Sequence, residues 1–78
     1  MSYQEWVIIT RRVISKSLYN YRAEHGMGMN DMSKALGVSV KTYYRWERMK
    51  NTMEIEMMLL INEKIGVNLL DIILKETS

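Results

Sequence analysis

The stretch Ser33–Glu47, SKALGVSVKTYYRWE, decides the expected fold of this chain. At its centre is Gly37, which can take the positive φ that ends a helix in a tight turn. Ser39 follows two residues later and is a good N-cap for another helix, because its hydroxyl can accept a hydrogen bond from a free backbone N–H. The stretch therefore predicts a short helix, a Gly turn and a second helix.

The second of these helices, expected from Val40 to about Met49, has two different faces. Tyr43 and Trp46 are three residues apart, so they share one face, which we expect to point into the core. The outward positions are basic or aromatic: Lys41, Tyr44, Arg45 and Arg48. This layout is typical of a helix-turn-helix that places its second helix in the major groove of DNA.

Capping residues and Gly breaks predict three more helices. Ser2 and Glu5 form an S-x-x-E capping box for a long first helix, Thr52 is expected to cap the fourth, and Asn68 the fifth. The five expected helices span residues 3–24, 29–36, 40–49, 53–65 and 69–74. The fold class is therefore all-α, with a single domain over residues 1–78, a helix-turn-helix at about 29–49 and an N-terminal extension over residues 1–13.

Composition narrows the class of protein. The 78 residues include no Cys, which excludes disulfides and thiolate metal sites. No apolar run approaches the roughly 20 residues of a membrane span, and the N-terminus lacks the pattern of a signal peptide, so we expect a cytoplasmic protein. Residues 1–50 carry a net charge of +5 and residues 51–78 carry −3. The basic half is suited to contacts with phosphates, and the acidic half is expected to face another direction.

With these features the chain resembles the lambda-repressor-like helix-turn-helix family, the Cro, cI and Xre group of phage and bacterial regulators. The resemblance rests on Leu36-Gly37-Val38-Ser39, on Glu47 at the end of the next helix, and on Ile65-Gly66-Val67 before the last helix. It covers about residues 14–74. It implies a five-helix domain that binds double-stranded DNA specifically and regulates transcription, and we expect repression.

The resemblance also implies roles for individual residues. Family members commonly carry an Arg near the end of the first helix that pairs with the Glu ending the recognition helix, so Arg22 and Glu47 are expected to form a structural ion pair. Arg45 suits a bidentate contact with guanine, and Val40 suits the methyl group of thymine. The residues expected to face DNA bases are Val40, Lys41, Tyr44 and Arg45.

Phosphate contacts are expected around this helix, where they would position the protein without reading sequence. The N-terminal end of the 29–36 helix is also expected to offer N–H groups to a phosphate. The chain departs from the family where Met49 replaces a common Gly, so the following turn is expected to differ. The expected phosphate contacts are Asn30, Lys34, Ser39, Thr42, Arg48, Lys50 and Asn51.

Surplus apolar residues predict a further interaction surface. On the first helix a core stripe of Val7, Ile14, Leu18 and Tyr21 is flanked by a second stripe that needs another partner surface and consists of Trp6, Ile9 and Val13. On the fourth helix the residues expected to face the core are Ile55, Met58, Ile61 and Ile65. A second row on this helix consists of Met53, Met57 and Leu60. The expected dimer interface comprises Trp6, Ile9, Val13, Met57, Leu60, Leu70 and Leu74. A homodimer would place two recognition helices about 34 Å apart on a pseudo-palindromic operator.

Two alternatives remain open. The surplus apolar residues are also compatible with a monomer whose surface is unusually apolar. The same fold also serves as a protein-binding module, such as an antitoxin, antirepressor or anti-defence protein, acting through its apolar helices on a protein partner. No catalytic constellation, metal cluster or cofactor motif is present, since His25 stands alone, so we expect no enzymatic activity and no cofactor.

Overall fold

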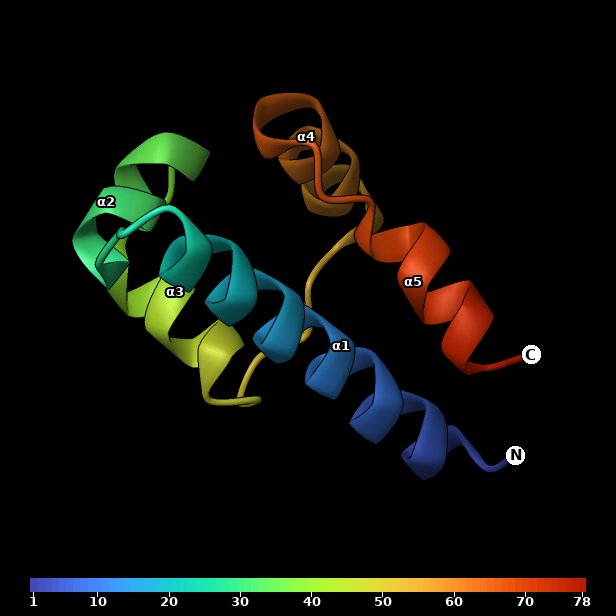
Figure 1. The fold of residues 1–78 in the computed structure, drawn as a ribbon. Coiled ribbons are helices and arrows are strands. Elements are labelled where there is room, and N and C mark those ends of the chain that lie inside the picture. Colours follow the sequence, from blue (N-terminus) through green and yellow to red (C-terminus); the bar gives the residue numbers. More distant parts are fainter.

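Five α-helices joined by short connections make up the computed structural model, which describes residues 1–78 (Figure 1). The helices are α1 (Tyr3–Glu24), α2 (Met29–Leu36), α3 (Val40–Glu47), α4 (Ile55–Ile65) and α5 (Leu69–Glu76). The long helix α1 runs through the middle of the molecule, with α2 and α3 at its carboxyl-terminal end and α5 beside its amino-terminal half. The expected all-α, five-helix fold is confirmed. None of the helices has the length and apolarity that crossing a membrane requires.

The helices begin where the capping residues predict, with one exception. Ser2 and Glu5 form the complete capping box of α1, each side chain bonding the other's backbone N–H at 3.2 Å. Asn68 accepts the N–H of Asp71 at 3.1 Å and so caps α5. The exception is α4, which begins at Ile55 with Glu54 as its N-cap; Thr52 lies two residues before this N-cap and accepts a hydrogen bond from Arg11.

This later start changes which side chains of α4 face the core. Met53 lies in the extended segment before the helix and is buried, so its assignment to a separate surface row was wrong. Ile55 was expected to be in the core but is 61% exposed. Met58 and Ile61 are buried, whereas Ile55 stands in the first turn of the helix, roughly 120° round the helix axis from Ile61.

Helix α3 ends at Glu47, two residues earlier than expected. Met49 takes a φ of 60° and is the one non-Gly residue with a positive φ. Its N–H donates to the carbonyl of Trp46 at 3.2 Å, and the next N–H, of Lys50, donates to the carbonyl of Arg45 at 2.9 Å. The turn therefore has the backbone that a Gly would adopt there, and Met49 takes it at a steric cost.

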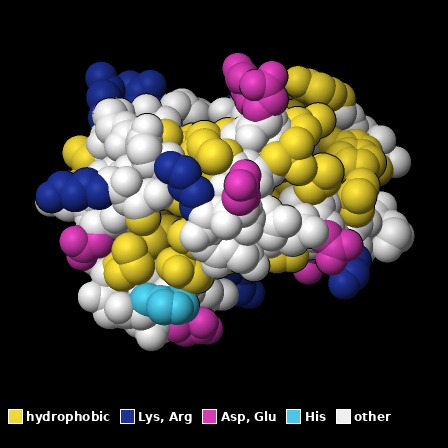
Figure 2. Space-filling view, turned by 90° about the horizontal axis from the view of Figure 1, so that it is seen from above, with side chains coloured by type: hydrophobic (Ala, Val, Ile, Leu, Met, Phe, Trp, Pro, Cys, Tyr) yellow, Lys and Arg dark blue, Asp and Glu magenta, His cyan; other side chains and the backbone are white.

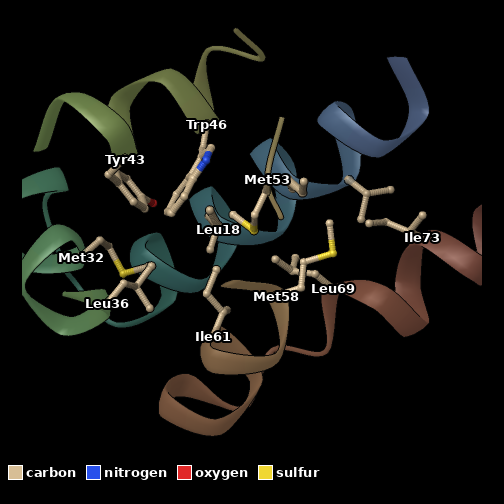
Figure 3. Packing of buried hydrophobic residues seen from close by; sticks show 12 residues of the cluster. Leu18, Met32, Leu36, Tyr43, Trp46, Met53, Met58, Ile61, Leu69 and Ile73 are labelled. Carbon is tan, nitrogen blue, oxygen red and sulfur yellow. The ribbon is translucent and has the colours of Figure 1, made fainter. Parts of the chain in front are cut away.

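The hydrophobic core lies where all five helices meet (Figure 3). Tyr43 and Trp46 point inward from α3, as expected, and their rings pack edge to face with centroids 6.4 Å apart. The core residues are Val13, Ile14, Leu18, Met32, Leu36, Tyr43, Trp46, Met53, Met58, Ile61, Leu69 and Ile73. Met is flexible enough to fill irregular gaps, and three of the eight Met residues serve here.

Helix α5 covers part of the second apolar stripe of α1. Val13 is only 8% exposed and belongs to the core, and Ile9 packs against it. The expectation that this stripe needs a surface from another molecule was therefore wrong for these two residues, because α5 packs on α1 within the same chain. Trp6 remains 39% exposed at the end of the stripe.

Candidate nucleic-acid interface

The connection between α2 and α3 is a tight turn built by Gly37. Gly37 has φ 72° and ψ 31°, the left-handed conformation that Gly takes without a Cβ clash. The N–H of Val38 donates to the carbonyl of Ser33 at 3.0 Å, which closes the end of α2. Ser39 then accepts the N–H of Thr42 at 3.1 Å and starts α3. The expected helix, turn and helix are confirmed at these residues.

The outer face of α3 is presented to solvent because its inner face is buried. Tyr43 is 0% exposed, whereas Val40 and Tyr44 on the outer face are each 43% exposed. The guanidinium of Arg48 lies 5.6 Å from the ring centroid of Tyr44, a cation–π contact that braces both side chains. All four residues expected to face bases are exposed: Val40, Lys41, Tyr44 and Arg45.

Glu47, at the end of α3, is held by two helices at once. Arg22 of α1 bonds it side-on, with Nε 2.6 Å from Oε2 and Nη2 3.0 Å from Oε1. Tyr43 donates its hydroxyl to the same carboxylate, and Ser15 donates to the Glu47 backbone carbonyl at 2.6 Å. The expected Arg22–Glu47 pair is present, and the bonds from Ser15 and Tyr43 were missed. We call these four residues the Glu47 network.

The protonation states in the Glu47 network follow from its geometry. The hydrogen bond to Glu47 is the largest influence on Arg22 and raises its pKa above the ordinary value. Burial, followed by the hydrogen bond to Glu47, raises the pKa of the Tyr43 hydroxyl far above its usual range. Tyr43 is therefore a neutral donor and Arg22 a charged one, so both bonds to the carboxylate are charge-assisted.

A second polar contact joins α1 to the segment after α3. Arg11 donates from Nη2 to the hydroxyl of Thr52 at 3.1 Å. Arg11, Ser15 and Arg22 lie on one face of α1, since they are separated by four and seven residues. The sequence did not reveal this contact, although the spacing of polar residues along a largely apolar helix face could have indicated it.

The residues expected to contact phosphates are only partly free to do so. Asn30, Lys34, Arg48 and Lys50 are exposed, whereas Thr42 and Asn51 are half-buried. Ser39 is exposed, but its hydroxyl donates to the Thr42 hydroxyl at 3.0 Å and also caps α3. These two hydroxyls are thus already paired with each other.

The N-terminal end of α2 differs from the expectation. Asp31 accepts the N–H of Gly28 at 2.9 Å, so its carboxylate sits at this helix end. A negative charge there repels a phosphate and takes up a donor that would bind it. The expected phosphate contact at this helix end is therefore disfavoured, which leaves the outer face of α3 and the segment after it as the basic surface.

Exposed apolar side chains gather on the opposite half of the molecule. Figure 2 shows hydrophobic side chains spread over the part that holds α4 and α5. Of the residues expected in a dimer interface, Trp6, Leu60 and Leu74 are exposed, whereas Ile9, Met57 and Leu70 pack partly against the core and Val13 belongs to it. Ile55 and Leu59, at 61% and 57% exposure, were missed. We call Ile55, Leu59, Leu60 and Leu74 the apolar surface.

Comparisons with known proteins agree with this arrangement. A family model described as helix-turn-helix matches residues 18–72, more than two thirds of the chain. No curated protein and no solved structure matches the chain significantly. The matched residues include α2, the Gly37 turn, α3 and α4, together with the carboxyl-terminal end of α1 and the first half of α5. The chain belongs to the lambda-repressor-like helix-turn-helix family of DNA-binding proteins.

Proposed function

We propose that this protein is a sequence-specific transcriptional regulator, a Cro- or Xre-type repressor that inserts α3 into the major groove of its operator. The observation that carries the proposal is the exposed outer face of α3, with Val40, Lys41, Tyr44 and Arg45 held outward by a buried inner face. Helices are the elements that fit the major groove, and Arg and Lys are the side chains that most often read guanine there.

The Glu47 network supports this proposal because it fixes α3 in one orientation. A recognition helix reads bases only if its side chains reach them at the correct angle and depth. A bidentate Arg–carboxylate pair is more directional than apolar packing. Arg22 and Ser15 of α1 hold the carboxyl end of α3 through such bonds. The outer residues of α3 are thereby presented on a rigid support.

The apolar surface supports a homodimer as the DNA-binding form. Four large aliphatic side chains are exposed, and they lie on α4 and α5, not on α2 or α3. Two copies joined about a two-fold axis would present two recognition helices one helical turn of DNA apart, about 34 Å. The matching operator is pseudo-palindromic, with half-sites read by Arg45 and its neighbours.

The experiment that tests the proposal is selection of operators from a pool of random duplex DNA, followed by affinity measurements at several salt concentrations. We expect a selected sequence with two related half-sites and a steep loss of affinity as salt rises, because each neutralised phosphate releases counterions. An unselective pool, together with no binding at low salt, would contradict the proposal and favour a protein-binding module on this fold.

The homodimer has its own measurement. Sedimentation equilibrium of the free protein should show a monomer–dimer equilibrium that Leu59→Asp weakens. Lys64→Asp, a change of charge at another exposed position of the same helix, is the control. A monomer at all concentrations combined with single, unpaired half-sites in the selected DNA would rule out the dimer.

A further inference from the structure

A groove lies between the N-terminal extension of α1 and the segment that leads from α3 to α4. Its volume is about 220 Å³, and it is lined by Tyr3, Trp6, Val7, Thr10, Arg11 and Thr52. The walls are mostly apolar, with two aromatic rings, and Trp6 is 39% exposed. None of the lining residues belongs to α2 or α3, although Thr52 directly follows Asn51, one of the expected phosphate contacts.

Arg11 is the only charged residue of this groove, and it has no anionic partner. Its single hydrogen bond runs from Nη2 to Thr52, while its Nε is shielded from solvent and lacks an acceptor. The two ion pairs of the structure, Arg22–Glu47 and Lys75–Asp71, do not involve it. A guanidinium has five N–H donors, and the bond to Thr52 uses only one of them, so the terminal nitrogens of Arg11 have donors left for an acceptor that enters the groove.

The dimensions and the lining indicate the kind of molecule that fits. Pockets that hold whole small molecules usually have volumes of about 300–1,000 Å³, so this groove suits one or two side chains better than a free ligand. Trp, Tyr and Arg are the residue types that dominate the energetics of protein–protein interfaces. A cationic donor at an apolar groove complements a carboxylate placed beside an apolar side chain.

We propose that this groove is a docking site for a segment of a partner protein in which an aromatic or aliphatic side chain is followed by Asp or Glu. The apolar side chain packs between Tyr3, Trp6 and Val7, and the carboxylate pairs with Arg11. This binding site goes beyond the proposed DNA-binding function, since it would operate whether or not α3 reads DNA.

The test uses two capped dipeptides as probes, N-acetyl-Phe-Glu-amide and N-acetyl-Phe-Gln-amide, which differ only in the carboxylate. Binding to the full chain is followed by NMR through the indole N–H of Trp6. The indole of Trp46, which is 5% exposed in the core, is the internal reference. We expect the Glu probe to bind about fivefold more tightly than the Gln probe, as an ion pair of modest strength would give.

Matched variants separate the groove from general surface effects. Arg11→Gln should abolish the preference for the Glu probe, whereas Arg12→Gln, which removes an exposed charge from the neighbouring position, should keep it. Trp6→Ala should weaken both probes, with binding followed through the backbone N–H of Val7. Ile8→Ala, at a position that is 48% exposed and outside the groove, should leave both probes unchanged.

Several results would overturn the proposal. Equal affinity of the two probes, or a Glu preference that persists in Arg11→Gln, would remove the role of Arg11. Tighter binding of free 3-phenylpropionate than of the Glu probe would assign the groove to a small acid instead of a protein segment. A Trp6 shift that grows with protein concentration and without any probe would assign the groove to a second copy of this chain.

Discussion

The helix-turn-helix half, α1 to α3, and the C-terminal half, α4 and α5, are held by different kinds of contact. In the first half, Glu47 is bonded by Arg22, Tyr43 and Ser15, all with little access to solvent. In the second half the only ion pair, Lys75–Asp71, has side chains that are 77% and 51% exposed, which makes it worth little. That half is held by apolar packing instead.

Because of this difference, the two halves contribute differently to the orientation of α3 and to the stability of the fold. Apolar contacts are non-directional, so they hold α4 and α5 against α1 without demanding one precise angle. Bidentate bonds are directional and set the angle of α3 relative to α1. Variants in the two halves should therefore affect the free energy of unfolding and the DNA affinity in different proportions.

The largest expected effect is on stability, from the apolar half. Ile61 is 0% exposed, so Ile61→Ala should lower the free energy of unfolding by about 2–5 kcal/mol, through lost burial and a residual cavity. Urea denaturation measures this, and Ile61→Val, with a loss of about 1 kcal/mol, keeps the series measurable if the Ala variant unfolds. Glu63→Ala, at an exposed position of the same helix that lies outside the apolar surface, should cost far less. Equal losses at both positions would show that apolar burial on α4 does not determine the stability of this half.

The Glu47 network should come next in stability but first in effect on DNA binding. Arg22→Ala leaves a carboxylate that is 6% exposed without its ion partner. Such a loss costs about 3–5 kcal/mol in buried pairs, and we expect the lower end because Arg22 itself is 19% exposed.

Lys16→Ala, an exposed cation on the same helix, is the control for Arg22→Ala. At a temperature where all variants are folded, Arg22→Ala should bind the selected operator more weakly than Ile61→Val does. If the two variants lose DNA affinity in proportion to their stability, the network has no separate role in orienting α3.

Base reading should be sensitive to Arg45, with a smaller effect. Arg45→Ala should reduce discrimination at one base pair by about 1–3 kcal/mol. Lys50→Ala should instead weaken all sequences alike and reduce the salt dependence by about one counterion. Competition binding with single-base operator variants measures both. A uniform loss across all sequences for Arg45→Ala would remove Arg45 from the base-reading residues.

The raised pKa of Tyr43 predicts a loss of stability at alkaline pH. The folded state holds the phenolic proton more tightly than the unfolded state, whose Tyr pKa is about 10. Stability from this residue is therefore complete below about pH 10 and falls at higher pH by up to about 1.4 kcal/mol per pH unit. Denaturation of wild type and Tyr43→Phe across this range isolates the effect, because the Phe variant lacks the titrating group. Parallel pH profiles for the two proteins would contradict it.

The smallest effect concerns the turn after α3. Met49→Gly relieves a left-handed conformation that costs a non-Gly residue about 1–2 kcal/mol, but Gly adds backbone entropy of about 0.5–1 kcal/mol to the unfolded state. We expect a net gain of about 0.5 kcal/mol by urea denaturation. Met49→Ala removes the same side-chain contacts while keeping the Cβ, so it should not gain stability. A gain as large as that of Gly would assign the effect to the side chain.

Much of the fold could be read from local sequence signals. Gly37, Ser39 and the Ser2–Glu5 box act within three or four residues, and the structure has the helix ends where they predict them. The start of α4 could not be read in this way. Thr52 is a good N-cap by type, but its hydroxyl accepts a bond from Arg11, which is 41 residues away in sequence.

The candidate site likewise has features that the sequence predicts and features that depend on tertiary packing. The outward position of Val40, Lys41, Tyr44 and Arg45 follows from helix periodicity, because burying one face of a short helix exposes the other. The rest of the Glu47 network and the groove beside Arg11 depend on how α1 lies across α3. These contacts join residues far apart in the chain, so only the packing of α1 decides them.

Local sequence signals predict the helices, the Gly37 turn and the two faces of α3, because backbone capping and side-chain periodicity act within a few residues. The tertiary structure alone decided that α5 covers Val13, that Ile55 faces solvent, and that Arg11 meets Thr52 beside an aromatic groove. An apolar side chain on a helix is more stable when it is shielded from water, but its type does not specify which residue shields it. That partner is set by the packing of the whole chain.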